Sequence, residues 1–244
     1  MTNSEPSNDQ FIDFQCPYCS SELSFPETKL GTAQECPFCF ETVVVLPANS
    51  KMGWKLPLPI ETPRLNLRPL RTEDLPDWLE FVQDDDSYTF LNNNAPNEED
   101  ATSWLANNIL LRFTHPKGCL ALGIEIKPDT KIIGYLSFYL TDHVDHRQAT
   151  FHIMMHPAHR RKGYGTEALH GLISFGFSGV ALHDIRVSID NRNLAGRRMV
   201  EKAGMKLEGE FIEQCRVKGE WISTAYYAIL STWWQKRTVS PQAP

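Results

Sequence analysis

Residues 153–168 combine an apolar segment, a proline turn, a basic run at 160–162 and a glycine pair, Gly163 and Gly165. A helix that begins after the first glycine has backbone N–H groups without an internal partner, and its macrodipole adds positive potential there. Glycine lets the backbone come close to a ligand. The segment therefore predicts a phosphate-binding site built from backbone amides.

Two other phosphate motifs share part of this pattern. Gly163-x-Gly165-x-x-Ala168 also fits the dinucleotide-binding fingerprint, and Asp184 lies at about the right distance for its ribose carboxylate. In that fold the first glycine follows the strand directly, whereas seven residues separate Met155 from Gly163 here. A nucleotide P-loop does not fit because no Gly-Lys-Ser/Thr follows. Dinucleotide binding and a glycine turn without a chemical role stay open as the weaker alternatives.

Four of the six cysteines form two Cys-x-x-Cys pairs, Cys16 with Cys19 and Cys36 with Cys39, separated by 16 residues. This spacing is typical of a zinc ribbon, in which each short loop presents two thiolates to a tetrahedral ion. So short a segment buries little core, so the metal would contribute folding free energy directly. Two disulfides, or a ribbon without metal, are the alternatives, and a reducing cytosol disfavours the first.

The elements that must position these residues follow from hydrophobic periodicity and capping signals. Strands are expected near 65–68, 119–126, 131–140, 149–155, 184–190, 206–214 and 220–230. Helices are expected at 72–83 with Thr72 as its cap, and at 97–113, 163–177 and 193–202. The order predicts an α/β fold with a mixed central sheet flanked by helices.

The chain of 244 residues divides into five predicted parts. These are a disordered N-terminus (1–10), the zinc ribbon (11–46), a proline-rich linker (47–63), the α/β domain (64–237) and a loose tail (238–244). No apolar run is long enough to span a bilayer, and the polar, acidic first residues are unlike a signal peptide, so a cytoplasmic protein is expected. The net charge of −6 disfavours nucleic acid as the main partner.

Several of these segments together resemble the GCN5-related N-acetyltransferases. Residues 160–165 are similar to the Arg/Gln-x-x-Gly-x-Gly/Ala signature of that family. Residues 61–70 resemble the opening strand of the subfamily that acetylates ribosomal protein N-termini. Residues 190–209 resemble its fourth-helix segment, and residues 227–230 its late-strand tyrosine. In family order the matches span about residues 60–237, which is more specific than any one motif.

The resemblance implies a binding mode for acetyl-CoA, with pyrophosphate on the amides of the glycine loop and the pantetheine arm along strand 150–155. Asn193 would reach the cofactor from the fourth-helix segment. The residues implied in cofactor binding are Ile153, Met155, Arg160, Arg161, Lys162, Gly163, Tyr164, Gly165, Thr166 and Asn193.

The resemblance also implies the catalytic groups. Tyr227 matches the general acid that protonates the departing thiolate, with Tyr226 as the alternative if the register differs by one residue. Thr150 stands where members often have a glutamate base, so His152, on the same face, or an ordered water is the expected substitute. Gly196 stands where the family commonly has a serine.

The expected function is acetyl transfer from acetyl-CoA to a primary amine. A weak base suits an N-terminal α-amine, with a pKa near 8, better than a lysine amine near 10.4. The acidic runs 84–86 and 98–100 either attract a cationic amine or are ordinary surface. Because residues 11–46 carry five acidic side chains and one lysine, a net −4, the ribbon is expected to contact protein rather than nucleic acid. The alternative is a non-catalytic acyl-CoA-binding module whose ribbon recruits a partner.

Overall fold

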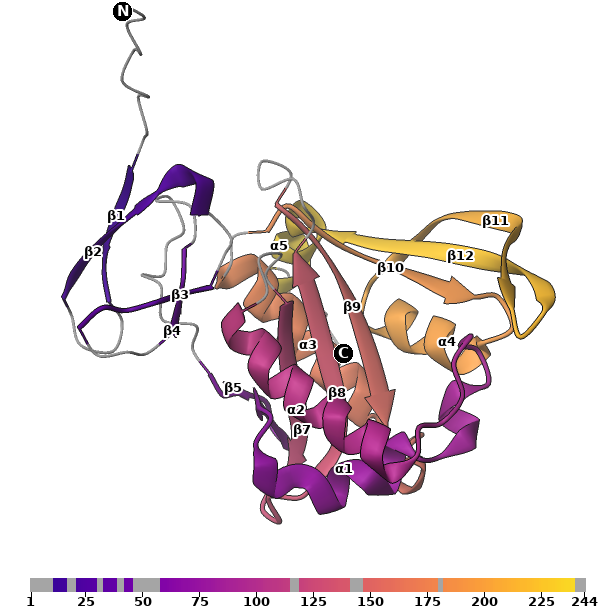
Figure 1. Cartoon of the computed structure of the whole chain (residues 1–244). Helices are drawn as coiled ribbons and strands as arrows, with labels where there is room; N and C mark the ends of the chain where they lie inside the picture. The colour runs from indigo at the N-terminus through magenta and orange to yellow at the C-terminus, as the bar shows by residue number, and fades with distance from the viewer. Residues whose placement is uncertain are drawn as a thin grey trace, which may run out of the picture.

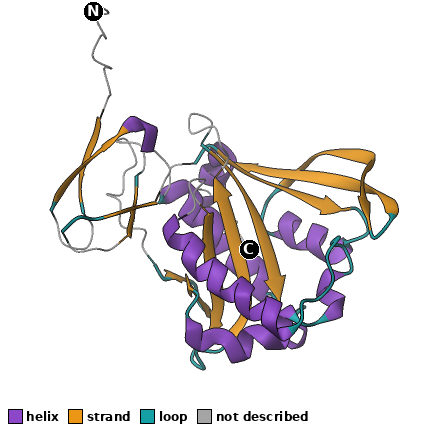
Figure 2. Ribbon diagram, viewed as in Figure 1, coloured by secondary structure: helices purple, strands orange, loops and turns teal. Residues whose placement is uncertain are grey.

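A mixed eight-stranded sheet forms the body of the molecule, in the order β11-β12-β10-β9-β8-β7-β6-β5 (Figures 1 and 2). The computed structural model describes residues 11–16, 21–29, 33–38, 42–45, 58–114, 119–140, 147–179 and 182–239. The strands of this sheet are β5 (Ile60–Glu61), β6 (Leu65–Pro69), β7 (Cys119–Ile126), β8 (Ile132–Leu140), β9 (Gln148–Met155), β10 (Asp184–Asp190), β11 (Lys206–Val217) and β12 (Glu220–Leu230). The predicted α/β class with a mixed sheet is confirmed.

Five α-helices accompany the sheet within the described residues. They are α1 (Leu75–Val82), α2 (Glu98–Thr114), α3 (Tyr164–Ser178), α4 (Leu194–Lys202) and α5 (Ser231–Val239), with the short 3-10 turns η1 (Glu27–Lys29), η2 (Thr72–Asp74), η3 (Asp85–Tyr88) and η5 (Pro157–His159). Helices α1 and α2 lie over one face of β7 and β8, and α3 lies over the other (Figure 1).

Two apolar clusters hold these layers together. On the α1–α2 face, Trp78 and Phe81 pack with Ile132 and Met154 of the sheet. On the α3 face, the buried side of the helix packs against alternate residues of the central strands. The helix contributes Ala168, Leu169, Leu172 and Ile173, and the strands contribute Leu67, Leu136, Phe138 and Phe151. Full burial of side chains of this size, about 1.5–3 kcal/mol each, is the main force that assembles the layers.

Two elements differ from the sequence prediction. Helix α1 begins at Leu75 rather than at Thr72, so the predicted cap is wrong. The carboxylate of Asp74 accepts from the amide of Arg71, which holds residues 72–74 in a 3-10 turn, and Pro76 suits the first turn of the helix that follows. Strand β5 also pairs with β6 at residues 60 and 61, within the segment predicted as a linker.

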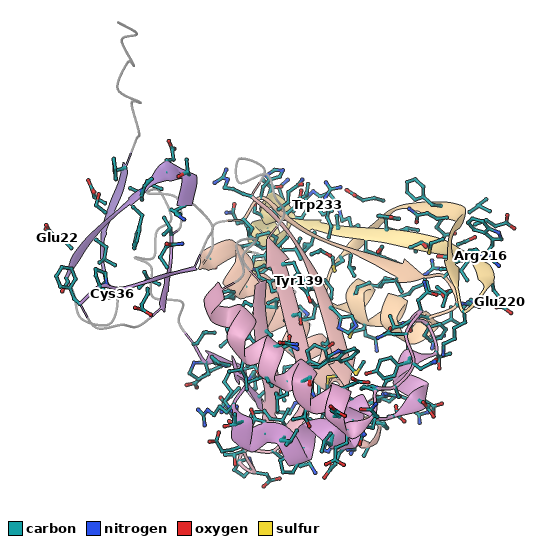
Figure 3. The ribbon with its side chains drawn as sticks, viewed as in Figure 1. Glu22, Cys36, Tyr139, Arg216, Glu220 and Trp233 are labelled. Atoms are coloured by element: carbon teal, nitrogen blue, oxygen red, sulfur yellow. The ribbon has the colours of Figure 1, made fainter. Side chains whose placement is uncertain are left out.

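Helix α5 was not predicted. Its sequence, Ser-Thr-Trp-Trp-Gln-Lys-Arg-Thr-Val, has few strong helix formers, so packing must stabilise it. The ring of Trp234 lies 5.7 Å from that of His170 on α3. The ammonium of Lys206 lies 4.2 Å from the ring centre of Trp233, which is labelled in Figure 3.

The described residues of the N-terminal module contain two antiparallel strand pairs, β1 (Phe11–Gln15) with β2 (Glu22–Pro26) and β3 (Ala33–Glu35) with β4 (Thr42–Val44). It lies beside the main sheet, where β3 contacts α2 (Figure 1). The predicted disordered start (1–10), most of the predicted linker (47–57 of 47–63) and the last residues (240–244) lie outside the described residues. No helix in the described part of the chain is long and apolar enough to cross a membrane.

Candidate active site

Strands β9 and β10 are paired over only three residues each. Residues 148–150 pair in parallel with residues 184–186, and the pairing between these strands goes no further, although β9 continues to Met155 and β10 to Asp190. Figure 1 shows the two strands diverging from this point. The backbone of β9 after residue 150 therefore has one edge that β10 does not cover.

The amides of Ile153 and Met155, residues that the resemblance implies in cofactor binding, point toward this uncovered edge. On the other edge, the amide of His156 donates to the carbonyl of Ile133 on β8 at 2.8 Å. Amides alternate in direction along a strand, so those of Ile153 and Met155 point away from β8. This is the direction that their predicted role requires.

The start of α3 offers further amides. Gly163 precedes the helix with φ at +84°, a left-handed conformation that glycine adopts without strain, and no side chain caps this end. The first helical hydrogen bond runs from the amide of Glu167 to the carbonyl of Gly163. The amides of Tyr164, Gly165 and Thr166 therefore have no partner within the helix, as an anion site requires.

The three basic residues of the loop have different environments. Arg160 donates to the carbonyl of Met155 at 3.0 Å, to the carboxylate of Asp84 at 3.0 Å and to the hydroxyl of Ser87. The side chains of Arg161 and Lys162 are exposed. Arg160 thus ties the end of β9 to η3, and the exposed pair carries the charge that is accessible to a ligand.

Asp84 belongs to the acidic run that the sequence analysis considered as an attractor for a cationic amine. Its carboxylate accepts from the amide and hydroxyl of Ser87 and from Arg160. Burial alone would raise the pKa of Asp84, but these hydrogen bonds outweigh it and lower the pKa. This carboxylate has a structural role, while Asp85 and Asp86 are exposed.

Asn193 caps α4. Its side-chain oxygen accepts from the amide of Gly196 at 2.9 Å. A Cβ atom added to Gly196 would lie 2.9 Å from the side-chain nitrogen of Asn193. The glycine in place of the expected serine therefore leaves room for this cap.

His152 lies on the face of β9 that α1 and α2 cover. Side chains alternate along a strand, so His152 shares this face with Thr150 and with Met154, which packs against α1. The imidazole is half-buried and lies 5.5 Å from the Tyr135 ring. Burial lowers the pKa of His152 from its usual value of 6.5, so the ring is neutral at pH 7, as a general base must be.

Tyr227 is 1% exposed and lies beneath α4. Its hydroxyl accepts from Arg197 at 3.0 Å and donates to Glu201 at 2.8 Å. Tyr226 lies on the opposite face of β12, and its hydroxyl accepts from Gln214 at 2.7 Å. Alternation therefore puts Tyr226 and not Tyr227 on the face of the sheet that carries His152.

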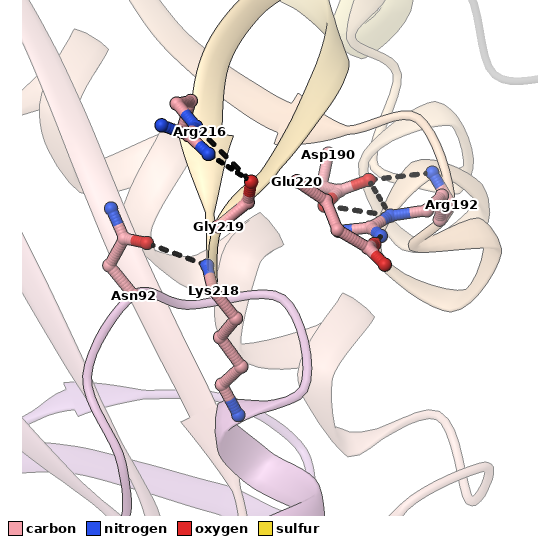
Figure 4. A network of polar contacts seen from close by, with 7 residues as sticks. All are labelled: Asn92, Asp190, Arg192, Arg216, Lys218, Gly219 and Glu220. Atoms are coloured by element: carbon pink, nitrogen blue, oxygen red, sulfur yellow. Dashed lines mark hydrogen bonds and ion pairs between the residues drawn. The ribbon is translucent and has the colours of Figure 1, made fainter.

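A connection that the sequence did not predict joins the loop between α1 and α2 to the tip of the β11–β12 hairpin (Figure 4). The amide of Lys218 donates to the side chain of Asn92 at 3.0 Å. The same tip is held by Arg192, which bonds to Asp190 at 2.8 Å and to Glu220 at 3.0 Å. Segments on the two sides of the diverging β9–β10 pair are thereby linked.

Comparisons of the sequence and the structure with known proteins identify the family. The family model "Acetyltransferase (GNAT) domain" matches residues 64–206. The uncharacterized N-acetyltransferase YnaD of Bacillus subtilis is 29% identical over 182 residues, covering 72% of this chain and 98% of YnaD.

Two solved structures have a similar fold. An acetyltransferase of the GNAT family from Bacillus anthracis has a TM-score of 0.64 at 23% identity, covering 70% of this chain and 98% of that one. Spermidine N-acetyltransferase from Vibrio cholerae, solved with CoA and spermine, has a TM-score of 0.60 at 20% identity, covering 70% and 98%. The chain belongs to the GNAT family of acetyltransferases, and it is an N-acetyltransferase.

Proposed function

We propose that the chain transfers an acetyl group from acetyl-CoA to a primary amine by direct attack of the amine on the thioester. One observation carries this proposal. The edge of β9 that faces away from β8 is not covered by β10 after residue 150, and the strand leads through a short loop to the uncapped start of α3. One continuous segment thus offers amides for the thioester and amides for the phosphates. The CoA in the Vibrio cholerae relative supports the same co-substrate class.

The reaction forms a C–N bond and breaks the C–S bond of the thioester. The amides of Ile153 and Met155 would stabilise the oxyanion that forms during attack. His152, neutral at pH 7, would accept the proton of the attacking amine, directly or through a water. The departing thiolate takes up a proton, and Tyr227 is the donor predicted from the sequence.

The favoured acceptor is a protein N-terminal α-amine, which also fits the resemblance of residues 61–70 to the subfamily that acetylates ribosomal protein N-termini. A base with a lowered pKa suits an amine that is partly neutral at cellular pH. The ion pair of Asp84 with Arg160 also leaves one carboxylate fewer to attract a polycation. A polyamine is the second candidate, because the Vibrio cholerae relative is a spermidine acetyltransferase.

A screen of N-terminal peptides, polyamines and aminoglycosides with acetyl-CoA, measured by free thiol, tests this proposal. We expect catalytic thiol release with a peptide α-amine and slower release with spermidine. Fast turnover with spermidine alone would replace the favoured acceptor. Acetyl-CoA binding without thiol release for any amine would contradict the proposed reaction and support the non-catalytic alternative.

Tyr227→Phe and Tyr226→Phe form a matched pair for the acid. If the Tyr227 hydroxyl protonates the thiolate, its removal should lower kcat by about 10²-fold with little change in acetyl-CoA affinity. Because that hydroxyl also bonds to Arg197 and Glu201, the melting temperature should fall too, so kcat must be measured well below it. A loss of kcat confined to Tyr226→Phe would assign the acid to the face of His152.

We further propose that the N-terminal module is a zinc ribbon. Cys16 and Cys36 are buried and share one small cluster with Leu23 and Val43, as the first ligand of each knuckle should. Cys19 and Cys39 lie outside the described residues, among which no group of three or more possible ligands occurs. Two buried cysteines in one small cluster fit the predicted four-thiolate donor set.

Native mass spectrometry should show one zinc per chain, lost when Cys16 and Cys19 are replaced with serine. The same replacement of Cys215, which is exposed on β11, should leave the zinc in place. A metal-free wild-type chain with a protease-resistant N-terminal module would contradict the prediction.

The ribbon's role is proposed to be contact with another protein. Phe11 and Phe38 are 56% and 62% exposed, and residues 11–46 carry a net charge of −4 from five acidic side chains and one lysine. Exposed aromatic side chains suit a protein contact, and the negative charge disfavours phosphate backbones.

A further inference from the structure

Arg64, just before β6, makes polar contacts with the first turn of α3. Its backbone amide donates to one carboxylate oxygen of Glu167 at 2.8 Å, and its Nε donates to the other at 2.6 Å. The hydroxyl of Thr62 donates to the same carboxylate at 2.7 Å. The turn that leads into β6 is therefore bonded to the start of α3, more than 100 residues later in the chain.

The same guanidinium also contacts the loop before α3. Its Nη1 donates to the carbonyl of Lys162 at 3.1 Å, and its central carbon lies 4.5 Å from the Tyr164 ring centre. A Cβ atom added to Gly163 would lie 3.3 Å from its Nη2. One planar side chain thus spans residues 162 to 167.

These contacts surround a segment with unfavourable backbone geometry and an uncapped helix start. Arg161 and Gly163 have φ values of +60° and +84°, and the left-handed conformation costs a non-glycine residue about 1 kcal/mol. No side chain caps the helix that follows. Burial alone would raise the pKa of Glu167, but the hydrogen bonds from Thr62 and Arg64 outweigh it and lower the pKa, which keeps the carboxylate charged.

We propose that Arg64 is a positioning residue for the acetyl-CoA loop, which it holds in its binding geometry through the Lys162 carbonyl and the Glu167 carboxylate. The inference rests on the proposed acetyl-CoA site. A planar fork that bonds to two partners and stacks on a ring has a geometry that lysine cannot reproduce. The role therefore depends on the shape of the guanidinium and not on its charge alone.

Arg64→Met and Arg64→Lys test this distinction. Both should raise the Kd for acetyl-CoA by about tenfold, a typical loss for a misplaced binding loop. KM for acetyl-CoA should rise with it, while kcat at saturation and KM for the acceptor stay within about twofold. Wild-type affinity in Arg64→Lys would show that charge suffices and would overturn the proposal, as would an unchanged Kd in Arg64→Met.

Glu167→Gln and Arg186→Met are the matched comparisons. Because Arg64 and Glu167 act together, their double variant should lose little more affinity than either single variant, and additive losses would overturn the proposal. Arg186 is 48% exposed, close to the 47% of Arg64, and pairs with Asp184 and Glu208. Arg186→Met should leave the Kd for acetyl-CoA unchanged.

A readout without ligand separates this inference from the proposed function. In Arg64→Met, the amide of Glu167, which donates to the carbonyl of Gly163, should exchange hydrogen faster than in the wild type, while the amides of β7 stay protected. Unchanged exchange at the amide of Glu167 would overturn the positioning role. A wild-type chain that does not bind acetyl-CoA would instead refute the proposed function, and the exchange rates would still decide the role of Arg64.

Discussion

Gly165→Val is expected to abolish the thermal stabilisation that acetyl-CoA gives the wild-type chain. At a ligand concentration 100-fold above Kd, that stabilisation is about 2.7 kcal/mol. Gly165 is the second residue of α3, and a Cβ atom there would lie 2.9 Å from the sulfur of Met199 on α4 and 3.7 Å from Met155 at the end of β9. A valine would force the first turn of α3 away from both, and its amides would move from the proposed phosphate-binding position.

This reason differs from the one that the sequence suggested. A side chain at Gly165 was expected to meet the phosphate itself, whereas the structure directs it toward α4 and β9. The difference can be measured. Because the end of Met199 is flexible, Gly165→Ala should lose only part of the acetyl-CoA effect, and Met199→Ala in the same chain should restore it by making room.

The measurement is the melting temperature of each variant with and without acetyl-CoA. Met199→Ala alone, which should lower the melting temperature without preventing the ligand-induced rise, is the control for lost packing. A normal ligand-induced rise in Gly165→Val would place the cofactor elsewhere. A failure of Met199→Ala to rescue Gly165→Ala would return the explanation to direct contact with phosphate.

Most of the candidate site that could be predicted from the sequence is built from residues that are close together in the chain. The turn of α3 at Gly163 and the strand that leads to it are encoded by neighbouring residues, so periodicity and glycine spacing were sufficient. Asp84, the ion-pair partner of Arg160, is 76 residues away, and nothing local distinguishes this arginine from Arg161. Both arginines were therefore predicted to bind the cofactor, and only the folded structure shows that Arg160 is engaged by Asp84.

Residues that support the site were harder to predict than residues that form it. Arg64 was part of a family-like segment but had no assigned role, because its partners at 162–167 become neighbours only when β6 packs beside α3. Asn92 gave no signal, since a single asparagine in a polar loop fits any surface. Contacts of this kind depend on tertiary packing, which local patterns do not encode.

Arg68→Met is expected to destabilise the chain by about 3–5 kcal/mol, the usual result of leaving buried charge without its partner. Arg68 on β6 is 7% exposed, and it donates to the two oxygens of Asp74 at 2.9 and 2.7 Å and, through Nε, to Glu125 on β7. Asp74 and Glu125 are 6% and 7% exposed. Methionine fills a similar volume, so the loss should come from the two carboxylates and not from a cavity.

The stability lost in Arg68→Met should depend on pH, and the shifted pKa of Glu125 gives the direction of that dependence. Burial alone would raise the pKa of Glu125, but hydrogen bonds from Arg68 and Asn66 outweigh it and lower the pKa. In the wild type this group therefore contributes stability above its unfolded pKa, and the contribution is lost as pH falls through the folded pKa. In Arg68→Met the unpaired Glu125 carboxylate would protonate at a higher pH than usual. The difference in stability should therefore be largest near pH 7 and shrink toward pH 4.

Urea unfolding of both chains at pH 7 and at pH 4 measures this difference. Adding Asp74→Asn and Glu125→Gln to Arg68→Met should recover part of the lost stability at pH 7, because the buried charges are then removed together. Glu220→Gln, which removes the charge of an exposed pair with Arg192 and leaves Arg192 bonded to Asp190, should change stability little. If Arg68→Met were no more destabilising than Glu220→Gln, or equally destabilising at both pH values, the three buried charges would not be what fixes η2 and α1 against the sheet.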